Sequence, residues 1–84
     1  MRDEEIIARL TDIFQVLFEN NAIRLTPKTT PKEIRGWDSM ANITLAMEVE
    51  QEFKIRIKPA EMASVGDVGD LAGLIQRHLP SVSR

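Results

Sequence analysis

The sequence predicts an all-α protein, a four-helix bundle with three long helices and one short third helix. Three segments repeat apolar residues at the spacing of one helical face. Residues that favour turns and loops separate these segments. The chain has 84 residues, so we expect a single domain spanning residues 1–84 with a modest hydrophobic core.

The first helix is expected at about residues 3–19. Its opening residues are acidic, and negative charge is favoured at a helix N-terminus. The pair Asn20 and Asn21 is expected to end it, because Asn favours helix caps and left-handed backbone. The apolar residues that share one face of this helix are Ile6, Ile7, Leu10, Ile13, Phe14, Leu17 and Phe18.

Residues 20–37 form the longest connection, and two prolines interrupt it. A loop of this length is unusual in a compact domain, but it suffices to run back along the first helix. Leu25 and Ile34 are its expected anchors in the core. Trp37 is either a third anchor or a cover for the turn that precedes the next helix. Gly36 is expected to supply a positive φ in that turn.

The second helix, expected at about residues 39–53, has two separate apolar faces. At about 100° per residue, one side contains Leu45, Ala46, Val49 and Phe53. Met40, Ile43 and Met47 fall on nearly the opposite side. A helix in a small domain needs only one buried face. The second face is therefore predicted to bind a partner or ligand, unless another element covers it.

Residues 54–58 alternate basic and apolar side chains, as a strand does. The stretch is short and has no partner strand, so we expect an extended loop. Pro59 suits the first position of a short third helix at about residues 59–64, because its missing N–H is not needed there.

The last helix is expected at about residues 68–79. Asp67 is its expected N-cap, and Pro80 is expected to stop it. Its predicted core face consists of Val68, Leu71, Ala72, Ile75 and Leu79.

Ser39 is placed at the start of the second helix, where backbone N–H groups lack partners within the helix. These groups and the helix dipole favour negative charge, so a phosphate ester on the Ser39 hydroxyl would be stabilised there. Asp38 and Ser39 are also both preferred N-cap types, and either is a candidate for a simple cap. The second apolar face begins beside Ser39, which favours a functional site.

Asp38, Ser39 and Met40, with the apolar spacing that follows them, resemble the phosphopantetheine attachment region of acyl carrier proteins. In that family an Asp-Ser-Leu motif opens the second helix. Met40 replaces the usual Leu here, which conserves volume. The resemblance covers nearly the whole chain, because length and helix order also match. It implies a four-helix bundle of acyl-carrier-protein type, with a long loop between the first and second helices.

The resemblance also implies a non-catalytic carrier function. Ser39 would hold a 4′-phosphopantetheine arm derived from coenzyme A, with Asp38 in the attachment motif. A phosphopantetheinyl transferase would attach the arm, whose thiol would hold an acyl or aminoacyl group as a thioester. Ligases, ketosynthases and acyltransferases of fatty acid, polyketide or related biosynthesis would load and process that group. The carrier would be a monomer.

The residues implied to dock partner enzymes are Met40, Ile43, Thr44, Met47 and Glu50. Members of the family usually place acidic side chains along the first half of the second helix. This chain departs from that pattern, because residues 39–47 carry no charge and Thr44 stands where an acid is common. Docking is therefore expected to rest on apolar contact more than on ion pairs.

Composition argues against several other classes. The chain has no Cys and one His, so we expect neither a metal site nor a Cys–His catalytic pair. A net charge of −2 argues against a nucleic-acid binder, including a helix-turn-helix protein. No apolar run is long enough to span a membrane and no signal peptide is visible, so a cytoplasmic location is expected. The alternative is a small helical interaction module without a prosthetic group, which would hold a partner helix on the same apolar face.

Overall fold

The computed structural model describes residues 2–79, and these contain no strand. The elements are α1 (Asp3–Leu17), the 3₁₀ turn η1 (Pro31–Glu33), α2 (Ser39–Phe53), α3 (Pro59–Ala63) and α4 (Val68–His78). The predicted all-α fold, with three long helices and one short one, is confirmed.

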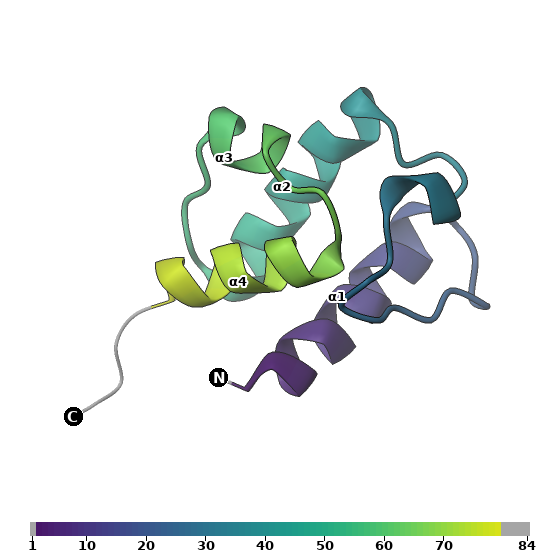
Figure 1. Ribbon diagram of the computed structural model, residues 1–84, viewed down its shortest axis with the longest axis horizontal. Helices are drawn as coiled ribbons and strands as arrows, with labels where there is room; N and C mark the ends of the chain where they lie inside the picture. Colours follow the sequence, from purple (N-terminus) through teal and green to yellow (C-terminus); the bar gives the residue numbers. More distant parts are fainter. Residues whose placement is uncertain (1, 80–84) are drawn as a thin grey trace.

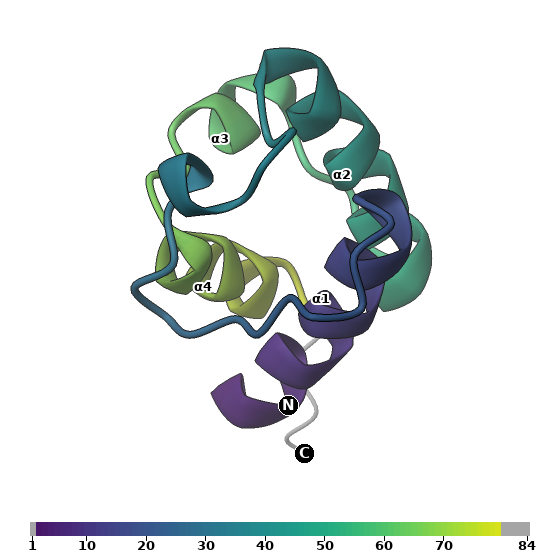
Figure 2. The ribbon, with the colours of Figure 1, turned by 90° about the vertical axis from the view of Figure 1, so that its right-hand side faces the viewer.

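Helices α1, α2 and α4 surround the core, and α3 lies beside α2 at one end of the bundle (Figure 1). α1 packs against both α2 and α4, whereas α3 packs mainly against α2. The view in Figure 2 shows the long loop passing from the end of α1 to the side of α4. Each long helix contributes fully buried side chains, among them Ile6, Leu10, Phe14, Leu45, Val49, Leu71 and Ile75.

Three helices end slightly earlier than predicted. α1 ends at Leu17, because Glu19 has a φ of 51° that cannot continue a right-handed helix. α3 is one residue shorter than predicted. α4 ends at His78, and Leu79 is extended, as expected for a residue that precedes proline. Pro80, the predicted stop, lies outside the described residues.

The long loop is anchored largely as predicted. Ile34 and Trp37 are buried, and Leu25 is half-buried. Trp37 meets the Phe14 ring edge-on, with 5.0 Å between ring centroids, so it is a true core anchor. Gly36 has a φ of 93°, as expected for the turn before α2.

The loop also holds the start of α4, which the sequence did not reveal. The Val68 N–H donates to the Thr29 carbonyl at 2.8 Å, and the Gly69 N–H donates to the Pro27 carbonyl at 2.7 Å. A side chain at Gly69 would place its Cβ 2.8 Å from that Pro27 oxygen, so the close approach requires glycine. The loop thereby supplies acceptors to the first turn of α4.

Helix α2 has the two faces that its spacing predicts. The inner face is buried in the core and consists of Leu45, Val49 and Phe53. Ala46 is half-buried at its edge. The outer face is exposed and consists of Met40 at 77%, Ile43 at 64% and Met47 at 54% of full exposure. No other part of residues 2–79 covers the outer face, so it is available to partners.

Candidate functional site

Asp38 caps α2 and leaves Ser39 exposed in the first helical position. The Asp38 Oδ1 atom accepts a hydrogen bond from the Ala41 N–H at 2.9 Å, and the Asp38 carbonyl accepts one from the Asn42 N–H at 2.8 Å. Of the two candidate caps, Asp38 is therefore the cap. The Ser39 side chain is exposed, and its hydroxyl has no hydrogen-bond partner within residues 2–79.

The surroundings of Ser39 suit a phosphate ester. The first turn of α2 contains no acidic side chain, and the positive end of the helix dipole lies at Ser39. One oxygen of the neighbouring Asp38 carboxylate, Oδ1, is engaged by the cap contact. The N–H groups of Ser39 and Met40 have no acceptor within the described residues, so both remain available to phosphate oxygens.

Asn42 joins three parts of the chain next to this site. The Trp37 Nε1–H donates to Asn42 Oδ1 at 2.9 Å, and the Asn42 Nδ2 donates to the Met62 carbonyl at 3.2 Å. One side chain therefore ties the loop before α2, the first turns of α2 and the end of α3 together. The sequence analysis missed this role. The sequence feature that could have indicated this role is the position of Asn42, a polar residue between the inner face of α2 and the start of its outer face.

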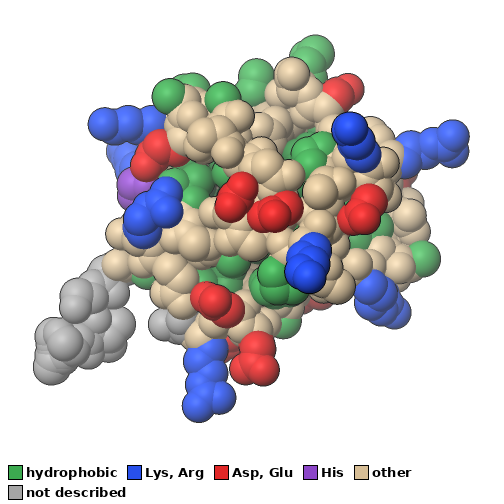
Figure 3. Space-filling view, viewed as in Figure 1, with side chains coloured by type: hydrophobic (Ala, Val, Ile, Leu, Met, Phe, Trp, Pro, Cys, Tyr) green, Lys and Arg blue, Asp and Glu red, His purple; other side chains and the backbone are tan. Residues whose placement is uncertain are grey.

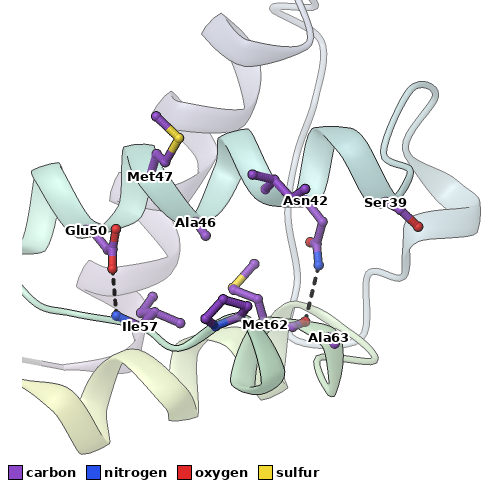
Figure 4. Close-up of a pocket in the computed structure, with 10 residues that line it drawn as sticks. Ser39, Asn42, Ala46, Met47, Glu50, Ile57, Met62 and Ala63 are labelled. Carbon is purple, nitrogen blue, oxygen red and sulfur yellow. Dashed lines mark hydrogen bonds between the residues drawn. The ribbon is translucent and has the colours of Figure 1, made fainter.

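A groove of about 390 Å³ runs between α2 and α3 and begins at Ser39 (Figure 4). Its lining is mostly apolar and consists of Ser39, Asn42, Ile43, Ala46, Met47, Glu50, Ile57, Pro59, Met62 and Ala63. Three of the predicted docking residues, Ile43, Met47 and Glu50, thus line one continuous surface with Ser39. Met40 and Thr44 are exposed on α2 but do not line the groove.

Glu50 closes the far end of the groove. Its Oε2 atom accepts a hydrogen bond from the Ile57 N–H at 2.7 Å, which attaches residues 54–58 to α2 (Figure 4). Residues 55–58 form a loop without helix or strand, as predicted, whereas Lys54 is left-handed and caps α2, and Ile57 is buried. Glu50 therefore has a structural contact in addition to its place beside the outer face, and its sequence position alone did not indicate that contact.

Glu61 and His78 connect α3 to α4. Glu61 Oε1 accepts a hydrogen bond from the Lys58 N–H at 2.9 Å, and Glu61 Oε2 lies 2.8 Å from His78 Nε2. The backbone hydrogen bond from Lys58, followed by the one from His78, lowers the pKa of Glu61 below its ordinary value. The single histidine is thus committed to a contact between helices, and it does not lie in the groove lining.

Comparison with known proteins identifies the family. Residues 5–75 match the family model described as the phosphopantetheine attachment site. The chain is 37% identical over 76 residues to acyl carrier protein 2 of Ralstonia nicotianae, covering 90% of this chain and 94% of that relative. The chain belongs to the acyl carrier protein family.

A solved structure agrees with this assignment. The fold of the carrier matches the solution NMR structure of a holo acyl carrier protein from Geobacter metallireducens with a TM-score of 0.78. The two are 33% identical, and the match covers 86% of this chain and 83% of the other.

Membership of the family establishes the cofactor and the general role. The carrier holds a covalently attached phosphopantetheine group and works with a phosphopantetheinyl transferase and biosynthetic enzymes. The alternative of an interaction module without a prosthetic group is not favoured. Within residues 2–79, no helix is both long and apolar enough to cross a membrane, and no cluster of side chains could hold a metal ion.

Proposed function

We propose that Ser39 is the attachment site and that the carrier presents acyl or aminoacyl thioesters to partner enzymes. The observation that carries this proposal is the exposed Ser39 hydroxyl, free of hydrogen bonds within the described residues, at the start of α2 and of the apolar groove. A transferase would move the phosphopantetheinyl group from coenzyme A to this oxygen. The new bond joins phosphorus to Ser39 Oγ, adenosine 3′,5′-bisphosphate leaves, and the hydroxyl proton passes to the transferase or to water.

Asp38 supports this transfer by fixing the local backbone. Its cap contact to Ala41 holds Ser39 in the first helical position and keeps the hydroxyl pointing to solvent. Asp38 is itself exposed next to Ser39, so a transferase would meet both side chains together. Substitution of Asp38 would therefore affect recognition as well as helix stability.

The groove gives the carried group an apolar surface next to its attachment point. When bound, phosphopantetheine supplies the thiol that forms the thioester. Ile43, Ala46, Ile57 and Met62 would cover an apolar acyl chain that enters the groove from the Ser39 end. Larger cargo would stay outside because Glu50 and Ile57 close the far end, and polar cargo would stay outside because the lining is mostly apolar.

We propose that the carrier performs no chemical step on its cargo. Catalysis by Ser39 would need a general base within hydrogen-bond reach. The Ser39 hydroxyl has no hydrogen-bond partner within the described residues, and His78, the single histidine, contacts Glu61. The partner enzymes would therefore be the loading and processing enzymes of the ligase, ketosynthase and acyltransferase types.

Intact-mass measurement tests the attachment site. Apo protein incubated with coenzyme A and a broad-specificity transferase should gain the mass of one phosphopantetheine group. Ser39→Ala should gain none. Ser64→Ala is the matched control and should still be modified, because Ser64 follows no Asp and its hydroxyl donates to the Glu61 carbonyl at 2.8 Å. Modification of Ser39→Ala would overturn the assignment.

A further inference from the structure

Resting on the proposed function, we propose that the docking surface of this carrier includes a basic margin, Lys54 and Arg56, and that partner enzymes meet this margin with acidic side chains. The apolar outer face of α2 would supply most of the affinity. The basic margin would select partners by charge, because electrostatic complementarity affects specificity and association rate more than affinity.

The backbone after α2 directs these basic side chains to the surface. Lys54 has a φ of 56°, which ends the helix and turns the chain. In the extended segment that follows, Ile55 and Ile57 are each only 8% exposed, and Arg56 between them is exposed. Burial of the two isoleucines fixes which side of the segment faces solvent, so Arg56 cannot turn inward without exposing them.

Arg56 lies next to the outer face of α2. A hollow of about 320 Å³ is lined by Met47, Glu50, Gln51, Ile55 and Arg56. Met47 and Glu50 also line the groove that begins at Ser39. The surface is therefore continuous from Ser39 along the outer face to Arg56.

The basic margin is not neutralised within the domain. The ion pairs within residues 2–79 are Arg9 with Glu52 at 3.2 Å and His78 with Glu61 at 2.8 Å. Lys54 and Arg56 take part in neither. Acidic and basic side chains are interspersed over the face shown in Figure 3, so that face is not wholly basic.

Two of the three acidic side chains of α2, Glu48 and Glu52, lie away from the basic margin. Glu52 pairs with Arg9 of α1, and Glu48 lines a separate hollow formed mainly by side chains of α1. Glu50 gives one carboxylate oxygen to the Ile57 N–H. Glu50 is therefore the acidic side chain of α2 that lies beside Arg56, and no ion pair within residues 2–79 joins the two.

An enzyme that acts at Ser39 is large enough to reach the basic margin. Ser39 and Met47 are separated by roughly 12 Å along the helix, at 1.5 Å per residue. A standard protein interface covers about 800 Å² on each partner, which corresponds to a patch roughly 30 Å across. A partner centred on the outer face would thus cover Arg56 as well.

A charge-swap experiment tests the inference with two forms of one transferase. The first form has a basic docking face, and the second carries acidic replacements of those docking residues. The carrier substrates are wild type, Lys54→Glu, Arg56→Glu and the double variant. Lys28→Glu is the matched control, because Lys28 is an exposed cation in the long loop and lines neither the groove nor the Met47–Arg56 hollow.

Wild type should be modified faster by the acidic form, and the margin variants faster by the basic form. Each reversal should change kcat/KM by about two- to fivefold, as for an exposed charge pair. The preference should shrink between 0.1 M and 1 M salt. Equal effects of Lys28→Glu and Arg56→Glu would mean that only the net charge of the carrier matters, and would overturn the inference. The absence of any effect of Lys54→Glu and Arg56→Glu would also overturn it.

Two further outcomes are distinguishable. If the broad-specificity transferase fails to modify wild-type carrier, the proposed function itself is wrong, and the margin inference falls with it. If wild type, but not Arg56→Glu, sediments with phosphatidylglycerol vesicles while the charge-swap rates stay flat, the margin binds anionic lipid. That result would also overturn the inference that partner enzymes contact it.

Discussion

The two faces of α2 contain the same kind of side chain, yet one is buried and the other is exposed. The inner face is buried in the core, where α2 packs against α1, whereas the outer face remains exposed beside Ser39. Hydrophobicity therefore does not distinguish the buried face of this helix from the face proposed to dock partners. Position around the helix axis does, and a single change of residue on either face should affect one property and spare the other.

The inner side of α2, which faces the core, and its groove side, which faces α3, are also stabilised by different contacts. Apolar packing fixes the inner side. The groove side adds individual polar contacts to the burial of Ile57 and Met62. Two of them, Asn42 to Met62 and Glu50 to Ile57, lie at the groove, and Glu61 to His78 joins α3 to α4. Such contacts can weaken one at a time, so the groove can change without loss of the core. This difference orders the following predictions by the size of their expected effect.

The largest effect is expected from the inner face. Phe53→Ala should lower the free energy of unfolding by roughly 3–5 kcal/mol, because it removes a buried aromatic ring. Met47→Ala on the outer face should change it by less than about 0.5 kcal/mol but slow turnover by partner enzymes. Urea denaturation followed by circular dichroism measures the stability of both variants, and the rate with a partner enzyme measures turnover. If Met47→Ala destabilises the domain as much as Phe53→Ala, the division of α2 into two faces is wrong.

The next effect concerns Asn42. Asn42→Ala leaves the buried Trp37 Nε1–H without its partner, which should cost about 1–3 kcal/mol. Asn42→Asp keeps an oxygen acceptor for Trp37 but sets a second acceptor against the Met62 carbonyl, and its loss should be smaller if the Trp37 contact dominates. Urea denaturation followed by Trp37 fluorescence compares the two. Equal destabilisation would mean that the contact to α3, and not the one to Trp37, dominates.

Much of the inner side could be predicted from the sequence, because it depends on local periodicity. The spacing of Leu45, Val49 and Phe53 predicts the buried face, and Asp38 before Ser39 indicates the helix start. The polar contacts of the groove could not be predicted. They join residues of different elements, such as Asn42 with Met62, and no short pattern encodes such a contact.

The long loop shows the same limit. Prolines and glycine predict a loop, and Trp37 is recognisable as an anchor by its size. The burial of Ile23 and Thr29 depends on how the loop crosses the bundle. That path is fixed by α4, whose first N–H groups need acceptors, and this requirement is visible only in three dimensions.

A smaller effect on stability is expected at Asp38 and Ser39, where α2 begins. Asp38→Ala should cost about 1 kcal/mol by removing the N-cap of α2, whereas Asp38→Asn should retain most of the stability, since its side-chain oxygen still accepts from Ala41. Ser39→Ala should leave stability nearly unchanged because its hydroxyl makes no internal hydrogen bond. Thermal unfolding of the three variants checks this order. A large loss in Ser39→Ala would show that the hydroxyl is structural.

The smallest effect should appear as a difference in acid sensitivity between the inner and groove sides. Hydrogen bonds from Lys58 and His78 lower the pKa of Glu61 in the folded state below its ordinary value of 4.5. The folded state therefore holds the ionised carboxylate better than the unfolded chain does. This contribution to stability is fully present above the unfolded pKa and is lost as pH falls through the folded pKa.

Glu61→Gln removes the ionisation, so the advantage of wild type over this variant should be present at pH 6 and diminish toward pH 3. The basic groups on or beside the Glu61–His78 contact are Lys58, Arg77 and His78. They stay positively charged while acid neutralises the Glu61 carboxylate. Urea midpoints for wild type and Glu61→Gln at several pH values give the difference, with Glu48→Gln as the control at an exposed carboxylate on α2.

Hydrogen exchange at acid pH should then rise first in α3, which the Glu61–His78 contact joins to α4, and last at Leu45 and Val49. Parallel stability curves, or simultaneous exchange in α3 and the inner face of α2, would show that the groove side does not loosen independently of the core.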